Sequence, residues 1–161
     1  MPQRVLYLAW APFFSGAERA LLLTLQSLDG SRYEPRVLAG TDGEFAAQVR
    51  DLGIPCDIAE LRPFDARHPF LSLQSISAVV RAARRHDVSV IHANEVPSFQ
   101  PGGYAARMLG VPALTHVRFF NGASGYRWFL RSRFSLALFV SRDLMNSALT
   151  EAPEIFKGRS E

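Results

Sequence analysis

The chain has 161 residues, 48% of them hydrophobic and 20% charged, so it can bury one core and is neither a disordered nor a fibrous protein. Its formal net charge of +3 comes from arginines spread along the chain, which gives no indication of a nucleic-acid partner. The single cysteine, Cys56, excludes an internal disulfide and a cysteine-rich metal site, and we interpret it as a small structural residue.

The apolar run near the N-terminus is shorter than the hydrophobic region of a secretory signal and far shorter than a membrane-spanning helix. We therefore expect a cytoplasmic protein, whose contact with a membrane, if it has one, is peripheral and at the inner face.

Apolar runs alternate with helix-type patterns along the whole chain. The apolar runs predict strands at residues 4–9, 35–40, 55–59, 88–92, 112–117 and 136–140. The helix-type patterns predict helices at residues 15–25, 44–52, 75–86, 103–109, 126–133 and 141–149, the last one stopped by Pro153. Loops are expected at residues 62–71, which hold two prolines, and through Pro97 and Pro101. The alternation predicts an α/β fold: a Rossmann-like three-layer α/β/α domain with a mostly parallel sheet.

Parallel sheets of this kind bind ligands beyond the carboxyl ends of their strands, so the segments that follow the strands are the candidates for function. After the first strand, Ser15 and Gly16 open a helix, and backbone N–H groups at a helix N-terminus favour an anion such as phosphate. The glycine patterns of dinucleotide-binding and P-loop proteins are absent, which disfavours both classes. From this loop alone a structural role is favoured, in which Gly16 allows a tight turn and Ser15 or Glu18 caps the helix.

Two further strands end in histidine followed by polar residues. His92 alone is best interpreted as a core histidine with a hydrogen-bonded ring, whereas Asn94 and Glu95 are better placed to meet a ligand. His116 and Arg118 end the fifth predicted strand, and such a pair near a phosphate-binding helix terminus suits an anionic leaving group. The histidines lack the spacing of metal ligands, so no metal is predicted.

Arginines and aromatic residues are interleaved between Arg118 and Phe134. Such a stretch suits a lipid-linked acceptor or an anionic membrane surface. The alternative, which we favour, is that Phe129, Leu130 and Phe134 pack in the core while the arginines are solvated.

The order of these motifs resembles the N-terminal domain of glycosyltransferase family 4, whose members are retaining enzymes of the GT-B type. Residues 15–19 (Ser-Gly-Ala-Glu-Arg) resemble the family's Gly-Gly-Ala-Glu-Arg turn, and residues 87–94 and 110–116 resemble its segments Asp-Val-Val-His-x-His and Gly-Val-Pro-x-x-x-x-His. The similarity spans essentially the whole chain. Ser15 departs from the pattern at the first glycine, and Asn94 stands where a second histidine is common.

The resemblance implies that a hexose is transferred from a UDP- or GDP-sugar to an acceptor hydroxyl with retained anomeric configuration, in cell-surface polysaccharide or glycolipid synthesis. The donor is a substrate, and neither a cofactor nor a metal is implied. The expected partners are this donor and a glycan or lipid-linked acceptor. The roles implied are catalysis by His116, donor diphosphate binding by Ser15 and Gly16, and acceptor or sugar binding by His92, Asn94, Glu95 and Arg118.

The resemblance also implies that residues 1–161 form the acceptor-side domain of a larger enzyme. In this family a C-terminal domain with a pair of glutamates holds the nucleotide, and no such motif follows here, so we expect the isolated chain to be inactive. Two alternatives stay open. One is a non-catalytic Rossmann-like ligand-binding or regulatory module, which is disfavoured because residues 10–15 hold no carboxylate; the other is a nucleotide-sugar epimerase of GT-B architecture.

Overall fold

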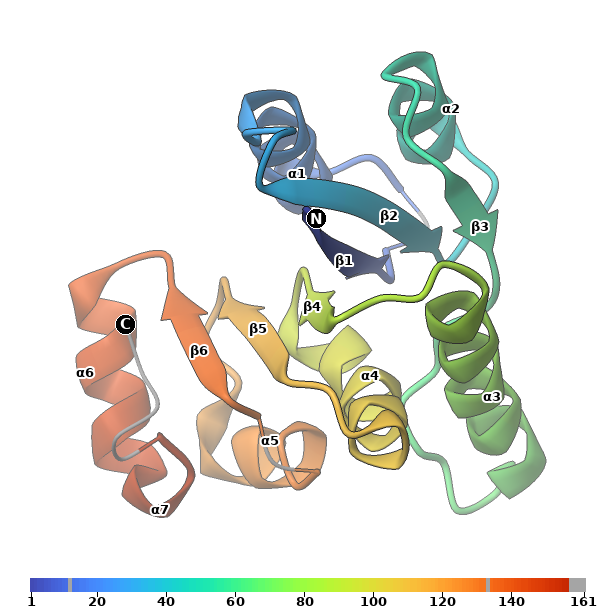
Figure 1. The fold of residues 1–161 in the computed structure, drawn as a ribbon. Coiled ribbons are helices and arrows are strands. Elements are labelled where there is room, and N and C mark those ends of the chain that lie inside the picture. The colour runs from blue at the N-terminus through green and yellow to red at the C-terminus, as the bar shows by residue number, and fades with distance from the viewer. Residues whose placement is uncertain (12, 133, 157–161) are drawn as a thin grey trace.

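The computed structural model describes residues 1–11, 13–132 and 134–156, which form a sheet with helices on both faces (Figure 1). The strands are β1 (Gln3–Ala9), β2 (Tyr33–Ala39), β3 (Cys56–Ile58), β4 (Val90–Ala93), β5 (Ala113–Val117) and β6 (Leu136–Phe139). The helices are α1 (Gly16–Ser27), α2 (Glu44–Asp51), α3 (Pro69–Arg85), α4 (Val96–Leu109), α5 (Gly122–Phe129), α6 (Arg142–Glu151) and α7 (Pro153–Phe156).

The strands are ordered β3-β2-β1-β4-β5-β6, and each neighbouring pair is parallel. The predicted α/β fold is thus confirmed. The strand order reverses between β1 and β4, and in open sheets of this type the crevice at such a reversal is the usual ligand site.

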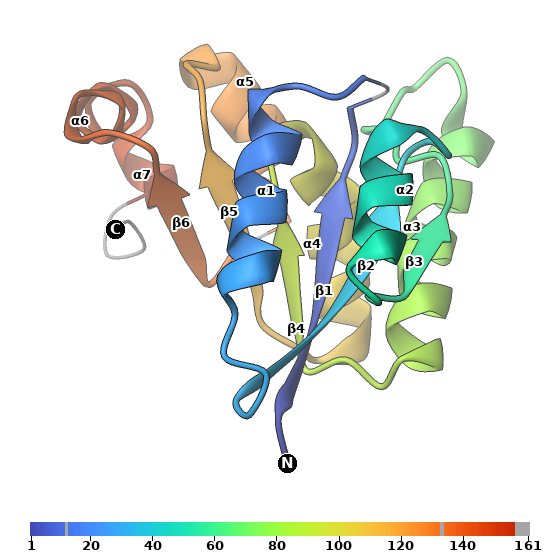
Figure 2. The same cartoon turned by 90° about the horizontal axis from the view of Figure 1, so that it is seen from above.

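The sheet separates two apolar clusters, one on each face. Val5, Tyr7 and Ala9 of β1 pack with the buried residues of α1 and α2, whereas Leu6 and Leu8 pack with those of α3 and α4. Figure 2 shows α1 and α2 in front of the sheet and α3 and α4 behind it. Burial on both faces explains why β1 reads as one continuous apolar run.

Two helices begin well before the residues predicted from the sequence. The loop expected at residues 62–71 ends early, because α3 starts at Pro69, where proline is tolerated since the first-turn N–H has no partner in the helix. The loop expected through Pro97 and Pro101 is wrong, because both prolines lie in α4. An internal proline costs a helix about 3 kcal/mol, which the burial of this helix offsets.

Shifts at the other predicted elements are smaller. The predicted helix 126–133 is α5, which ends at Phe129, and Arg133 lies outside the described residues. The predicted strand 88–92 is β4, which begins at Val90. The last predicted helix, α6, ends at Glu151, just before Pro153, and Pro153 is the first residue of the short helix α7.

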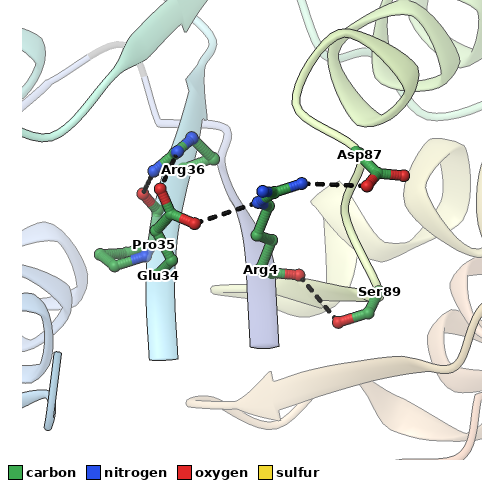
Figure 3. A network of polar contacts seen from close by, with 6 residues as sticks. All are labelled: Arg4, Glu34, Pro35, Arg36, Asp87 and Ser89. Atoms are coloured by element: carbon green, nitrogen blue, oxygen red, sulfur yellow. Dashed lines mark hydrogen bonds and ion pairs between the residues drawn. The ribbon is translucent and has the colours of Figure 1, made fainter. Parts of the chain in front are cut away.

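Ion pairs cluster at the amino edge of the sheet (Figure 3). Arg4 Nε lies 3.0 Å from Glu34 Oε2, and its guanidinium also contacts Asp87 at 2.9 Å. Arg36 forms a second ion pair with Glu34. The Ser89 hydroxyl donates to the Arg4 carbonyl at 3.2 Å. These charges pair with one another at an exposed edge, where each pair contributes about 0–1 kcal/mol. They hold strand ends together at the edge opposite the predicted site.

Candidate functional site

The start of α1 is built by a capping box. Ser15 is the N-cap; its hydroxyl oxygen accepts the Ala17 N–H at 3.2 Å, and the Ser15 N–H donates to the Glu18 carboxylate at 3.0 Å. The structural interpretation of Ser15 and Glu18 is therefore confirmed. The Gly16 N–H makes no hydrogen bond to any residue that the structure describes.

Gly16 opens onto a cavity of about 520 Å³ between β1 and β4. We call it the switch-point cavity, and its lining is Trp10, Ala11, Phe13, Ser15, Gly16, Ala17, Glu95, Arg118, Phe119 and Val140. The structure thus brings Ser15 and Gly16 together with Glu95 and Arg118, as the strand-end argument predicted.

Arg118 is oriented by Asn94. Its Nε donates to the Asn94 carbonyl at 2.8 Å, and a terminal nitrogen donates to Asn94 Oδ1 at 2.6 Å. The Asn94 side chain is fully buried and in turn donates to the Ala17 carbonyl on α1 at 3.2 Å. Asn94 therefore lies behind the cavity wall and positions the guanidinium that lines it.

Two buried carboxylates lie near Arg118. Glu95 is 5% exposed and accepts the Trp10 N–H at 3.2 Å, while Glu18 is 0% exposed. Burial first, and the negative charge of Glu18 second, raise the pKa of Glu95 above its ordinary value. Burial likewise lowers the pKa of the Arg118 guanidinium, against the opposing pull of both carboxylates. Glu95 therefore holds its proton up to a higher pH than an exposed glutamate does.

His92 and His116 contact each other on the α1 face of the sheet. Nε2 of His92 lies 3.0 Å from Nδ1 of His116, and the His92 ring also packs on Tyr7 with centroids 4.9 Å apart. Burial lowers the pKa of His92 to about 3 and that of His116 to about 4, so both rings are neutral at pH 7. The interpretation of His92 as a core histidine is confirmed.

His116 is the penultimate residue of β5 and so lies at the edge of the sheet where α1 begins. It is not among the residues that line the switch-point cavity, whereas Arg118, two residues later, is.

The stretch from Arg118 to Phe134 divides between core and surface. Leu130 and Phe134 are buried, and Phe129 packs partly buried against the same cluster, which confirms the favoured interpretation for those three. Exposed large side chains in the stretch are Phe119, Phe120 and Trp128, and the Arg131 guanidinium lies 5.5 Å from the Trp128 ring centre.

The remaining observations concern the cysteine, possible metal ligands and long apolar helices. Cys56 is half-buried, and burial raises the pKa of its thiol to about 11, which fits a structural residue. Among the described residues, no three His, Cys, Asp or Glu side chains are grouped as a metal ion would require. Within that same part of the chain, no helix is both long and apolar enough to cross a membrane.

Sequence reasoning missed a second cavity of about 490 Å³ at the same edge, over β1, β2 and β3. Trp10 lines it as well as the switch-point cavity, and Phe64 is another of its lining residues. Residues 62–71 show no hydrophobic periodicity, so nothing in their sequence indicated that they line a cavity. The aromatic Trp10 directly after a buried strand was the available clue.

Three solved structures illustrate the similarity of the fold. HepE of Anabaena, in complex with UDP and glucose, matches with a TM-score of 0.75 and 18% identity over 99% of this chain. MurG of Acinetobacter baumannii matches with a TM-score of 0.65 and 20% sequence identity over 86% of this chain. A UDP-N-acetylglucosamine 2-epimerase matches with a TM-score of 0.61 and 13% sequence identity over 94% of this chain. The chain spans 43%, 41% and 45% of these proteins. No curated protein matches the chain in sequence.

At these identities the structural matches establish the fold, which glycosyltransferases share with an epimerase, and do not choose between activities. The family is given by the model of the glycosyl transferase 4-like domain, which matches residues 15–152, from the capping box of α1 to the end of α6. The chain therefore belongs to the family of glycosyl transferase 4-like domains, with the Rossmann-like fold of GT-B glycosyltransferases.

Proposed function

We propose that this domain is the N-terminal, acceptor-side half of a retaining enzyme that transfers a hexose from a UDP- or GDP-sugar to an acceptor hydroxyl. The observation that carries the proposal is the switch-point cavity, where the start of α1 and the Arg118 guanidinium face one space. A second domain, which would hold the nucleotide, completes the site. The bound UDP and glucose in the Anabaena relative support this choice of donor class.

The electrostatics of the cavity suit a departing diphosphate. The Gly16 N–H and the dipole of α1 favour an anion, and Arg118 supplies a full positive charge. Preorganised donors of this kind stabilise the charge that develops on the leaving group without a metal ion. Glu95 also lines the cavity, and burial raises the pKa of its carboxyl above the ordinary value, which favours the neutral form relative to an exposed glutamate.

His116 is the proposed catalytic residue. Its ring is neutral at pH 7, so it can donate or accept one hydrogen bond with the transferred sugar while His92 orients it from behind. Glu95 lines the sugar and acceptor side in this proposal, whereas the buried His92 and Asn94 act behind it by positioning His116 and Arg118. The Ser15 hydroxyl is engaged in the cap, so its part in diphosphate binding is to present Gly16.

A lipid-linked acceptor and peripheral membrane contact belong to the same proposal. They are supported by the exposed Phe119, Phe120 and Trp128 and by the Arg131 guanidinium beside the Trp128 ring. The biosynthesis of a cell-surface polysaccharide or glycolipid would use such an acceptor. Sedimentation with anionic vesicles should fall in a variant carrying Phe119→Ser and Phe120→Ser, and unchanged sedimentation would reject the membrane contact.

The main test compares the product of the full reading frame with the 161-residue chain. Each is incubated with UDP- and GDP-hexoses, and donor hydrolysis and transfer are followed, with NMR used to assign the anomeric configuration of the product. We expect turnover only in the longer protein, with retention. No turnover of any nucleotide sugar there would favour a non-catalytic module, and 2-epimerisation of the donor sugar would favour an epimerase.

A further inference from the structure

The second cavity, which we call the Trp10–Phe64 cavity, lies beside the switch-point cavity and shares Trp10 with it. It has a volume of about 490 Å³, and its lining is Trp10, Gly40, Thr41, Glu60, Leu61, Arg62, Pro63, Phe64 and Asp65. It therefore opens beyond the carboxyl ends of β1, β2 and β3, and Trp10 lines both this cavity and the proposed donor site.

The Trp10 wall is held from two sides through its backbone. Its N–H donates to Glu95 Oε1 at 3.2 Å. Its carbonyl oxygen lies so close to Gly40 that a Cβ built on Gly40 would be 2.7 Å from it. Only glycine allows this approach at the end of β2, so the indole is carried on a rigid strand end.

The part of the lining formed by residues 62–65 is held by buried polar side chains of α3 and α4. Ser75 accepts the Arg62 N–H at 2.9 Å, and Ser72 accepts the Asp65 N–H at 2.9 Å. Gln100, which is 1% exposed, accepts the Phe64 N–H. Three backbone donors within the four residues 62–65 are thus satisfied by buried side chains, so this loop is preorganised although it lacks regular secondary structure.

The lining offers apolar faces next to charged hydrogen-bonding groups. Trp10 and Phe64 both line the cavity and are 38% and 40% exposed, so neither aromatic residue is fully covered by its neighbours. Glu60 and Asp65 are acceptors, and the Arg62 guanidinium, 2.5 Å from Glu60, is a donor. The Asp65 carboxyl has a pKa below its ordinary value, chiefly through its hydrogen bond with His68, so it is ionised at pH 7.

This combination fits a pyranose ring, which has an apolar face of C–H groups and an equator of hydroxyls. Two carboxylates against one guanidinium disfavour an anionic ligand, and the three charged groups disfavour a purely hydrocarbon chain. These two arguments favour a neutral sugar over either alternative.

We infer that the Trp10–Phe64 cavity binds the neutral sugar residue of the acceptor glycan that carries or adjoins the reacting hydroxyl. The inference rests on the proposed function. The glycan would lie against Trp10 and Phe64, with its hydroxyls bonded to Arg62, Asp65 and Thr41, and would pass Trp10 toward the switch-point cavity.

The test measures binding of small probes to the product of the full reading frame. The probes are the methyl glycosides of glucose, galactose, mannose and N-acetylglucosamine, with farnesyl phosphate as the lipid probe and UDP as the donor probe. The variants are Phe64→Ala, which removes one ring, and Thr41→Val, which removes one hydroxyl at nearly constant volume. Phe70→Ala is the matched control, because Phe70 is 78% exposed on α3 and is not among the cavity residues.

Saturation-transfer NMR should detect binding of at least one glycoside to the parent protein. The affinity for this glycoside should be about tenfold weaker in Phe64→Ala, weaker in Thr41→Val and unchanged in Phe70→Ala. UDP binding should stay constant in all three variants. The inference is overturned if no glycoside binds, if Phe64→Ala binds like the parent protein, or if farnesyl phosphate alone responds to the substitutions. UDP binding with no glycoside binding rejects this inference alone. Absence of UDP binding contradicts the proposed function instead.

Discussion

Replacement of Gly16 by alanine separates a structural role of this glycine from a ligand-binding one. A Cβ built on Gly16 meets no atom within 4 Å, and its φ is not among the positive values that favour glycine. Alanine therefore fits, and because it restricts the unfolded chain and favours the helix, the free energy of unfolding should stay equal or rise by up to about 1 kcal/mol.

The same methyl group would occupy the switch-point cavity where the proposed diphosphate approaches the Gly16 N–H. A hydrogen bond to a charged group contributes about 1.5–3 kcal/mol, so its loss should weaken UDP binding by roughly tenfold to a hundredfold. The assay pairs calorimetric UDP titration with urea unfolding, both on the full-length protein.

Gly30→Ala is the control, because Gly30 also has open space around it but lies between α1 and β2, at the opposite edge of the sheet. It should change neither quantity by a comparable amount. Gly16→Ala with normal UDP affinity and normal stability would refute the proposed contact. A marked loss of stability would instead show that the glycine is needed for the turn itself.

Two further predictions concern stability. Gly40→Ala should lower the free energy of unfolding, measured in urea, by about 1–3 kcal/mol, because the added Cβ would lie 2.7 Å from the Trp10 carbonyl oxygen. Gly43→Ala is the control and should cost less, because the nearest atom to its added Cβ is 3.8 Å away. Equal effects of the two substitutions would contradict the packing argument. The second prediction concerns pH, because folding lowers the pKa of His92 to about 3 and that of His116 to about 4, from about 6.5 in the unfolded chain. Between these values the unfolded chain binds more protons than the folded one. The free energy of unfolding should therefore be highest above pH 6.5 and should fall as the pH drops toward 4. For His92 the loss is about 2 kcal/mol by pH 5, and His92→Gln should flatten the profile in urea unfolding from pH 7.5 to 5; a parallel profile would contradict it.

The strands were predictable because burial on both faces imposes uninterrupted apolar runs. Residues 4–9 illustrate this, since both faces of β1 are covered. Helix starts were less accessible to prediction where prolines stand in the first turn. Pro69 and Pro97 signalled loops locally, yet both begin helices, because proline at the first helical positions gives up no internal hydrogen bond.

α4 shows how packing can overrule local preference. Residues 101–103 (Pro-Gly-Gly) read as a turn, but the glycines allow close contact: a Cβ on Gly102 would lie 2.5 Å from Leu8 Cδ1 on β1. The spacing of residues within the sequence carries no information on such an approach. Only the position of β1 against this helix reveals it.

The candidate site was predictable to the extent that it follows from strand ends. Gly16, Glu95 and Arg118 meet because β1, β4 and β5 are neighbours in a parallel sheet. The Trp10–Phe64 cavity was not predictable, because it depends on where buried Ser72, Ser75 and Gln100 hold a loop without periodicity.

The two departures from the family pattern can be understood from the hydrogen bonds they make. Ser15, where the family has a first glycine, adds a side-chain cap that Glu18 completes, and so it stabilises the turn that presents Gly16. Asn94, where a second histidine is common, supplies an acceptor to Arg118 and a donor to the Ala17 carbonyl. A neutral histidine also offers one donor and one acceptor, so the exchange keeps the number of bonds available at this point. Both changes therefore act on the support of Gly16 and Arg118 and leave these two cavity-lining groups themselves in place.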